Sequence, residues 1–149
     1  MKKDCAFAAR FDAGYLAATV LYFGFLATIV ILANAGAAKD IFLLATETFG
    51  GDKIAHAFLM GLFSFLMNSA LCCRKTSVGP LSIMTGSLIV YLLVLGEELS
   101  QVWQSRRTPD PVDALFDVMG IFLFAGLARL NQKRKTETAA TSPGDTHEK

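Results

Sequence analysis

Three long stretches without charged side chains most constrain what this chain can fold into. Residues 13–38 and 76–96 contain no charged residue, and the ionisable groups of residues 54–73 are His56 and two cysteines at the end of the stretch. Each stretch is long enough to cross a hydrocarbon layer about 30 Å thick at about 1.5 Å per helical residue. We therefore expect these stretches to be membrane helices rather than parts of a water-soluble domain.

A fourth stretch, residues 112–130, is shorter and carries Asp113, Asp117 and Arg129, but its middle is apolar. With a hydrophobic content of 53%, the sequence predicts an all-α protein, an integral membrane bundle of four transmembrane helices with a polar cluster at its outer face. The helices are expected at about 14–35, 54–73, 78–101 and 111–130. Residues 1–13 would form a short lead, 14–130 one transmembrane domain, and 131–149 a disordered cytoplasmic tail.

The distribution of basic residues predicts the orientation of the bundle. With a cytoplasmic amino terminus, nine basic residues lie inside and four outside, which favours both termini on the cytoplasmic side. The inside set is Lys2, Lys3, Arg10, Arg74, Lys75, Arg129, Lys133, Arg134 and Lys135, and the outside set is Lys39, Lys53, Arg106 and Arg107. The start of the chain also resembles a secretory signal, but its apolar run is longer than usual and favours an uncleaved first span.

Local signals predict where the helices begin and turn. Asp52 is expected to cap the second helix, and Asp110 with Pro111 is typical of a helix start. Residues 74–77 would form a tight inner turn, with Pro80 in the first turn of the next helix, where its missing N–H does no harm.

The predicted topology gathers polar side chains at the outer end of the bundle. This cluster contains six acids and three bases, with His56 neutral. The acids are Asp52, Glu97, Glu98, Asp110, Asp113 and Asp117, and the bases are Lys53, Arg106 and Arg107. Asp117 is the most costly, at about 3 kcal/mol for a charged Asp near the bilayer centre. It must face the bundle interior, be protonated, or pair with Arg106, Arg107 or His56. Glu97 reads as a solvated charge at a helix end, and Lys53 as an interface anchor.

This cluster carries a motif that resembles a known family. The sequence has Asp-Lys-x-x-His at residues 52–56, Glu-x-x-Gln at 98–101, Arg106, and Asp-x-x-x-Asp-x-x-Gly at 113–120. In this order and spacing the motif resembles that of the VanZ-like membrane proteins, over roughly half the chain. The resemblance implies a multi-pass protein of the bacterial inner membrane with a role in the cell envelope. The family's namesake is associated with resistance to the glycopeptide teicoplanin, so it also implies a link to glycopeptide resistance.

Three classes of function compete for the cluster. The first is binding of a membrane lipid head group or a lipid-linked cell-wall precursor at the outer face. The ligand-binding candidates are His56, Glu98, Gln101, Arg106, Asp113 and Asp117. The second is an enzyme acting on a lipid-linked substrate, with His56 or Glu98 as general base. The third and weakest is a proton or ion pathway through Asp117, His56 and Glu98.

The sequence predicts no resident cofactor and no nucleic-acid partner. A divalent cation remains an option, with Glu98, Asp113 and Asp117 as candidate ligands, although the spacing is not that of a diagnostic metal site. The structural alternative for Glu98, Gln101, Arg106, Asp113 and Asp117 is a set of polar contacts that joins the last two predicted helices. The oligomeric state stays open.

Overall fold

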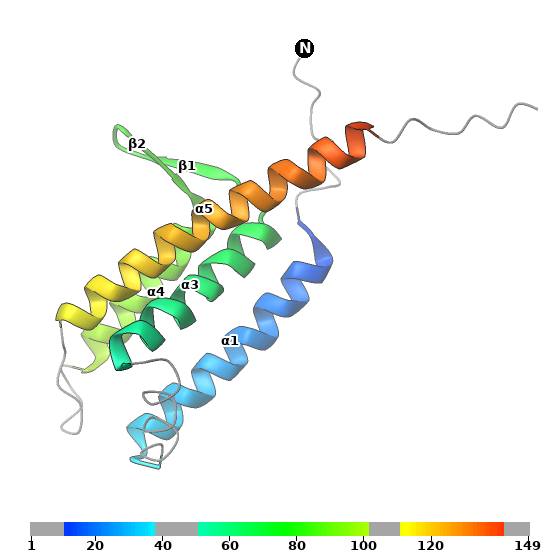
Figure 1. Ribbon diagram of the computed structural model, residues 1–149. Coiled ribbons are helices and arrows are strands. Elements are labelled where there is room, and N and C mark those ends of the chain that lie inside the picture. Colours follow the sequence, from blue (N-terminus) through cyan, green and yellow to red (C-terminus); the bar gives the residue numbers. More distant parts are fainter. Residues whose placement is uncertain (1–10, 38–50, 102–110, 142–149) are drawn as a thin grey trace, which may run out of the picture.

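The computed structural model describes residues 11–37, 51–101 and 111–141. These residues form four helices and one β-hairpin, so the expectation of a mostly helical protein with four helices is confirmed. The helices are α1 (Ala13–Asn34), α3 (Asp52–Ala70), α4 (Thr85–Gln101) and α5 (Pro111–Thr141). In Figure 1, α1 and α4 run in one direction, and α3 and α5 run in the opposite one.

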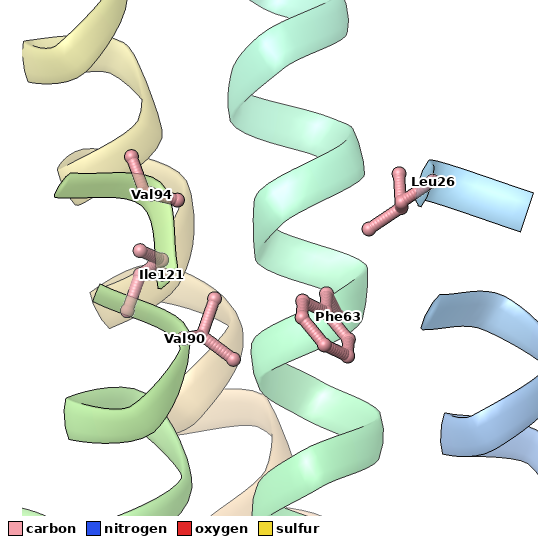
Figure 2. Packing of buried hydrophobic residues seen from close by; sticks show 5 residues of the cluster. All are labelled: Leu26, Phe63, Val90, Val94 and Ile121. Atoms are coloured by element: carbon pink, nitrogen blue, oxygen red, sulfur yellow. The ribbon is translucent and has the colours of Figure 1, made fainter. Parts of the chain in front are cut away.

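The helix α3 is the centre of the bundle, because α1, α4 and α5 all pack on it (Figure 1). Figure 2 shows the side chain of Phe63 on α3 between Leu26 of α1 and Val90 of α4. Val94 and Ile121 complete this small cluster of buried apolar side chains. The core is thus narrow, and each outer helix contributes only one or two residues to it.

The closest helix contact is between α3 and α5, which run parallel. Gly120 of α5 lies against the backbone of Ala57, so that a Cβ atom at position 120 would overlap the Ala57 carbonyl oxygen. Gly61, one turn further along α3, faces the ring of Phe124 and the carbonyl of Gly120. Small residues at such positions let two helix backbones approach closely. This contact sets the register of α5 against α3.

The segment between α3 and α4 corrects two predictions. α3 ends at Ala70 rather than 73, because Cys72 and Cys73 adopt positive φ angles of 49° and 51°, which a right-handed α-helix does not accept. The expected turn and the first residues of the predicted third helix are instead an antiparallel hairpin of β1 (Lys75–Val78) and β2 (Leu81–Met84).

The hairpin places Pro80 differently from the prediction. Gly79 has a φ of 58°, and Gly79 and Pro80 form the turn of the hairpin rather than the first turn of a helix. At the base of the hairpin, the backbone N–H of Thr85 donates to the carbonyl of Arg74 at 2.8 Å. The fold is therefore not purely helical, and α4 begins seven residues later than the predicted start at 78.

The helix termini differ from the sequence predictions at two further places. α5 continues to Thr141, so residues 131–141 are helical and not part of a disordered tail. α3 has Gly51 as its N-cap and Asp52 as its first helical residue, so Asp52 is not the capping residue. The expected helix start at Pro111 is confirmed. Residues 38–50, between α1 and α3, lie outside the described residues.

The extension of α5 reaches the start of α1. Asn131 donates to the Tyr15 hydroxyl at 2.9 Å, and the Lys135 ammonium lies 4.6 Å from the centre of the Tyr15 ring and 3.6 Å from the Asp12 carboxylate. Asp12 also caps α1, and the hydrogen bond from the Tyr15 backbone N–H lowers the pKa of Asp12. Because Asp12 stays ionised, it serves as helix cap and ion-pair partner at once.

Among the described residues, α1 alone is long and apolar enough to cross a membrane by itself. A helix of this kind near the amino terminus can be a membrane anchor or a signal sequence.

The register of α5 on α3 can be tested with a pair of glycines. Gly120→Ala should lower the free energy of unfolding by about 1–3 kcal/mol, because the new methyl group has no room beside Ala57. Gly126→Ala is the matched control on the same helix, since no atom lies within 4 Å of its Cβ position. It should leave stability unchanged or raise it by up to about 1 kcal/mol. Thermal unfolding followed by circular dichroism compares the two variants, and equal melting temperatures would show that the close contact is not formed.

Candidate functional site

The structure brings four of the predicted site residues to one end of the bundle. His56 lies near the start of α3, Glu98 in the last turn of α4, and Asp113 and Asp117 in the first two turns of α5. Gln101 is the last residue of α4, and its side chain lies outside what the structure describes, as do Arg106 and Arg107. The predicted pairing of Arg106 with Asp113 or Asp117 therefore falls outside the described residues.

Two acid–base pairs join α3 and α5 in register. The Lys53 ammonium donates to Asp113 Oδ1 at 2.7 Å, and one turn further along both helices His56 Nδ1 lies 3.4 Å from Asp117 Oδ1. Lys53 was expected to be an interface anchor, but the structure makes it the partner of Asp113. The two acids are four residues apart on α5 and the two bases are three residues apart on α3, so each set lies on one helix face. The two pairs therefore lie one above the other.

Asp117 is the most buried ionisable group of the site, with 2% of its surface exposed. It faces the bundle interior, as expected, and of the three predicted partners the structure places His56 beside it. Its Oδ1 atom makes no hydrogen bond with good geometry within the part of the chain that is described. A buried carboxylate oxygen in this state is costly, so it is ready to accept a hydrogen bond from another donor.

A cavity of about 370 Å³ opens beside this pair, between α1, α3 and α4. Its wall is almost entirely apolar, with contributions from Leu26 and Val30 on α1, Phe63 on α3 and Val94 on α4. Its polar lining residues are His56, Glu97 and Asp117. The volume falls within the range of about 300–1,000 Å³ that is typical of small-molecule sites.

Two features of this cavity were missed from the sequence. Glu97, which reads as a solvated helix-end charge, lines the cavity, whereas Glu98 is not among its lining residues. The α1 wall was also missed, because α1 is apolar on every side and its sequence carries no periodicity that marks one face. For Glu97 and Glu98, adjacent in sequence, only the rotation of α4 decides which one faces the cavity.

The metal hypothesis finds no support in this geometry. Within the described residues, no three His, Cys, Asp or Glu side chains converge as a metal-binding group. Glu98, Asp113 and Asp117 therefore do not form one there.

A buried polar network, also missed from the sequence, joins the same helices beyond the apolar core. The Asn68 amide donates to Ser87 Oγ at 2.8 Å and to Ser64 Oγ at 3.2 Å, and Asn68 Oδ1 accepts from the Ser87 backbone N–H at 3.1 Å. Ser64 Oγ in turn donates to the carbonyl of Ile121 on α5 at 3.0 Å. The spacing of Ser64 and Asn68, four apart in an apolar helix, was the available signal. The network ties α3 to both α4 and α5.

No family model, no curated protein and no solved structure matches this chain. The resemblance to VanZ-like proteins thus rests on the motif residues alone and stays a prediction.

The network predicts a sharp contrast between two adjacent buried residues. Asn68→Leu keeps the size of the side chain but removes three hydrogen bonds, so we expect a loss of about 2–4 kcal/mol in the free energy of unfolding. Ser69→Ala is the control, because Ser69 is also buried but its Oγ has no hydrogen-bond partner within the described chain. It should change stability by less than about 0.5 kcal/mol. Chemical denaturation measures the stability of both variants, and a larger loss for Ser69→Ala would contradict the network.

Proposed function

We propose that this protein is a multi-pass membrane protein that binds an amphiphile, a lipid or a lipid-linked envelope precursor, in the cavity between α1, α3 and α4. The apolar part of the ligand occupies the cavity, and its polar group lies at the end formed by His56 and Asp117. The observation that carries this proposal is the combination of an apolar cavity with a single polar end that holds a buried carboxylate oxygen without a hydrogen bond.

The distribution of apolar surface supports the membrane placement. Twenty-four large hydrophobic side chains are exposed in the described residues, whereas nine hydrophobic residues are buried. Nineteen of the exposed ones lie along α1, α4 and α5, for example Leu21, Leu92 and Leu123. In water so much apolar surface would drive association, but in a bilayer it faces lipid. α4 has 17 residues and so a length of about 26 Å, close to the bilayer core of about 30 Å.

The basic residues support the orientation. Six of those described lie at the hairpin end of the bundle, and Lys53 lies at the cavity end. The six are Arg74, Lys75, Arg129, Lys133, Arg134 and Lys135. By the positive-inside rule the hairpin end is cytoplasmic, and the cavity opens toward the outer leaflet of the bacterial inner membrane.

One observation favours the enzyme as the second candidate. Asp117 beside His56 Nδ1 is an arrangement that can orient an imidazole for general-base catalysis, with a lipid-linked substrate in the cavity. The binding proposal needs only the cavity and its polar end, and it therefore comes first.

The multi-pass topology predicts opposite labelling of the two ends. In a background with Cys5, Cys72 and Cys73 replaced by alanine, Ala37→Cys beyond the end of α1 should react with a membrane-impermeant maleimide in intact cells. Ser77→Cys in the hairpin should react only after the membrane is permeabilised. Labelling of Ser77→Cys alone in intact cells would show that the orientation is the opposite one. Equal labelling of the two cysteine variants in intact cells would refute a spanning bundle.

Binding in the cavity predicts that the purified protein retains an amphiphile. Ala27→Phe, on the α1 wall of the cavity, should reduce the retained lipid several-fold, because the ring occupies the space of the ligand. Ala17→Phe is the control, since Ala17 is exposed and does not line the cavity. Mass spectrometry of organic extracts from the washed protein gives the amount of retained lipid, and turnover assays with the same washed protein test the enzyme alternative. Equal retention by wild type and Ala27→Phe would contradict the cavity as binding site.

A further inference from the structure

We infer that the polar group received at Asp117 is a primary ammonium, so that the preferred ligand is an amine-bearing amphiphile. This inference rests on the proposed function, since it assigns the chemistry of the ligand for the same cavity. It starts from the Asp117 side chain, which is 3% exposed and lines the cavity, and whose Oδ1 accepts no hydrogen bond within the described chain.

The charges around the cavity favour a ligand whose polar group is a cationic hydrogen-bond donor over one whose polar group is an anionic acceptor. Its ionisable lining residues are two acids, Glu97 and Asp117, and one imidazole, His56. The Lys53 ammonium, the nearest basic side chain described at this end, is taken up by Asp113 at 2.7 Å. A phosphate here would face carboxylates and be repelled, whereas an ammonium is attracted by both. Arg106 and Arg107 lie outside the residues that the structure describes.

The choice between cations follows from geometry. A divalent metal ion prefers several oxygen ligands arranged around it, and no group of three suitable side chains converges in the described part of the site. A primary ammonium has three N–H donors and is satisfied by fewer carboxylates. One N–H would donate to Asp117 Oδ1, and the attached alkyl chain would extend past Phe63 and Leu26 into the apolar part of the cavity.

The ammonium can come from a simple long-chain amine or from the head group of an aminophospholipid, and the same test separates them. Native mass spectrometry of the detergent-purified full-length protein would compare dodecylamine, dodecanol and dodecyl phosphate at pH 7.5, where the amine is protonated. A second arm would compare phosphatidylethanolamine with phosphatidylcholine. We expect dodecylamine to bind at least tenfold more tightly than dodecanol or dodecyl phosphate. Preference for phosphatidylethanolamine would assign the aminophospholipid as source, and equal binding of the two phospholipids would assign the simple amine.

Two variants make the assignment specific. Asp117→Asn keeps the shape of the side chain and should abolish the preference for the amine, while dodecanol binding persists. Asp12→Asn makes the same chemical change at the other end of the bundle and should keep the preference. Equal binding of all three dodecyl compounds by wild type, or tighter binding of the phosphate, would overturn the ammonium inference but leave the cavity as a binding site. Failure of all three to bind would refute the proposed function itself.

Discussion

The close contact between α3 and α5 is the constraint on which the rest of the structure depends. Because Gly120 has no side chain, the two parallel backbones meet at Ala57, and this fixes the axial register of one helix on the other. Both acid–base pairs follow from that register. His56, one residue before Ala57, lies opposite Asp117. Lys53, one turn before Ala57, lies opposite Asp113. A shift of α5 by one turn toward the hairpin would move Asp117 away from His56, to a level at which α3 carries no base.

The polar side chains of the bundle are concentrated at the two ends of its small apolar core. Beyond one end, Asn68 and its two serine partners satisfy one another in a buried network. Beyond the other end, the Asp117 carboxylate retains an oxygen without a hydrogen bond beside an apolar cavity. The first arrangement is complete and stabilises the fold, whereas the second is incomplete in a way that a ligand can complete. This difference is the physical reason to place function at the cavity end.

Composition alone decides that the chain is mostly helical, whereas the boundaries of its elements depend on local turn residues and on distant contacts. The absence of charge in residues 76–96 is compatible with a helix, but Thr76 and Val78 are β-branched, and Gly79 with Pro80 favours a turn, so the first part forms a hairpin. The polar composition of residues 131–141 suggested disorder. Helix there is stabilised by contacts that no local pattern contains, since Asn131 and Lys135 bind Tyr15 more than a hundred residues away in the chain.

The sequence by itself determined that the protein is mostly helical and which residues are polar within its apolar segments. It also determined that His56, Glu98, Asp113 and Asp117 gather at one end of the bundle, because the lengths of the helices and the order of the loops bring them there. Only the tertiary structure decided which acid meets which base, and that Glu97 rather than Glu98 lines the cavity. It also decided that α1 forms a cavity wall. These outcomes depend on helix rotation and register, which are set by close packing at positions such as Gly120, and an apolar helix such as α1 carries no periodicity from which its rotation could be predicted.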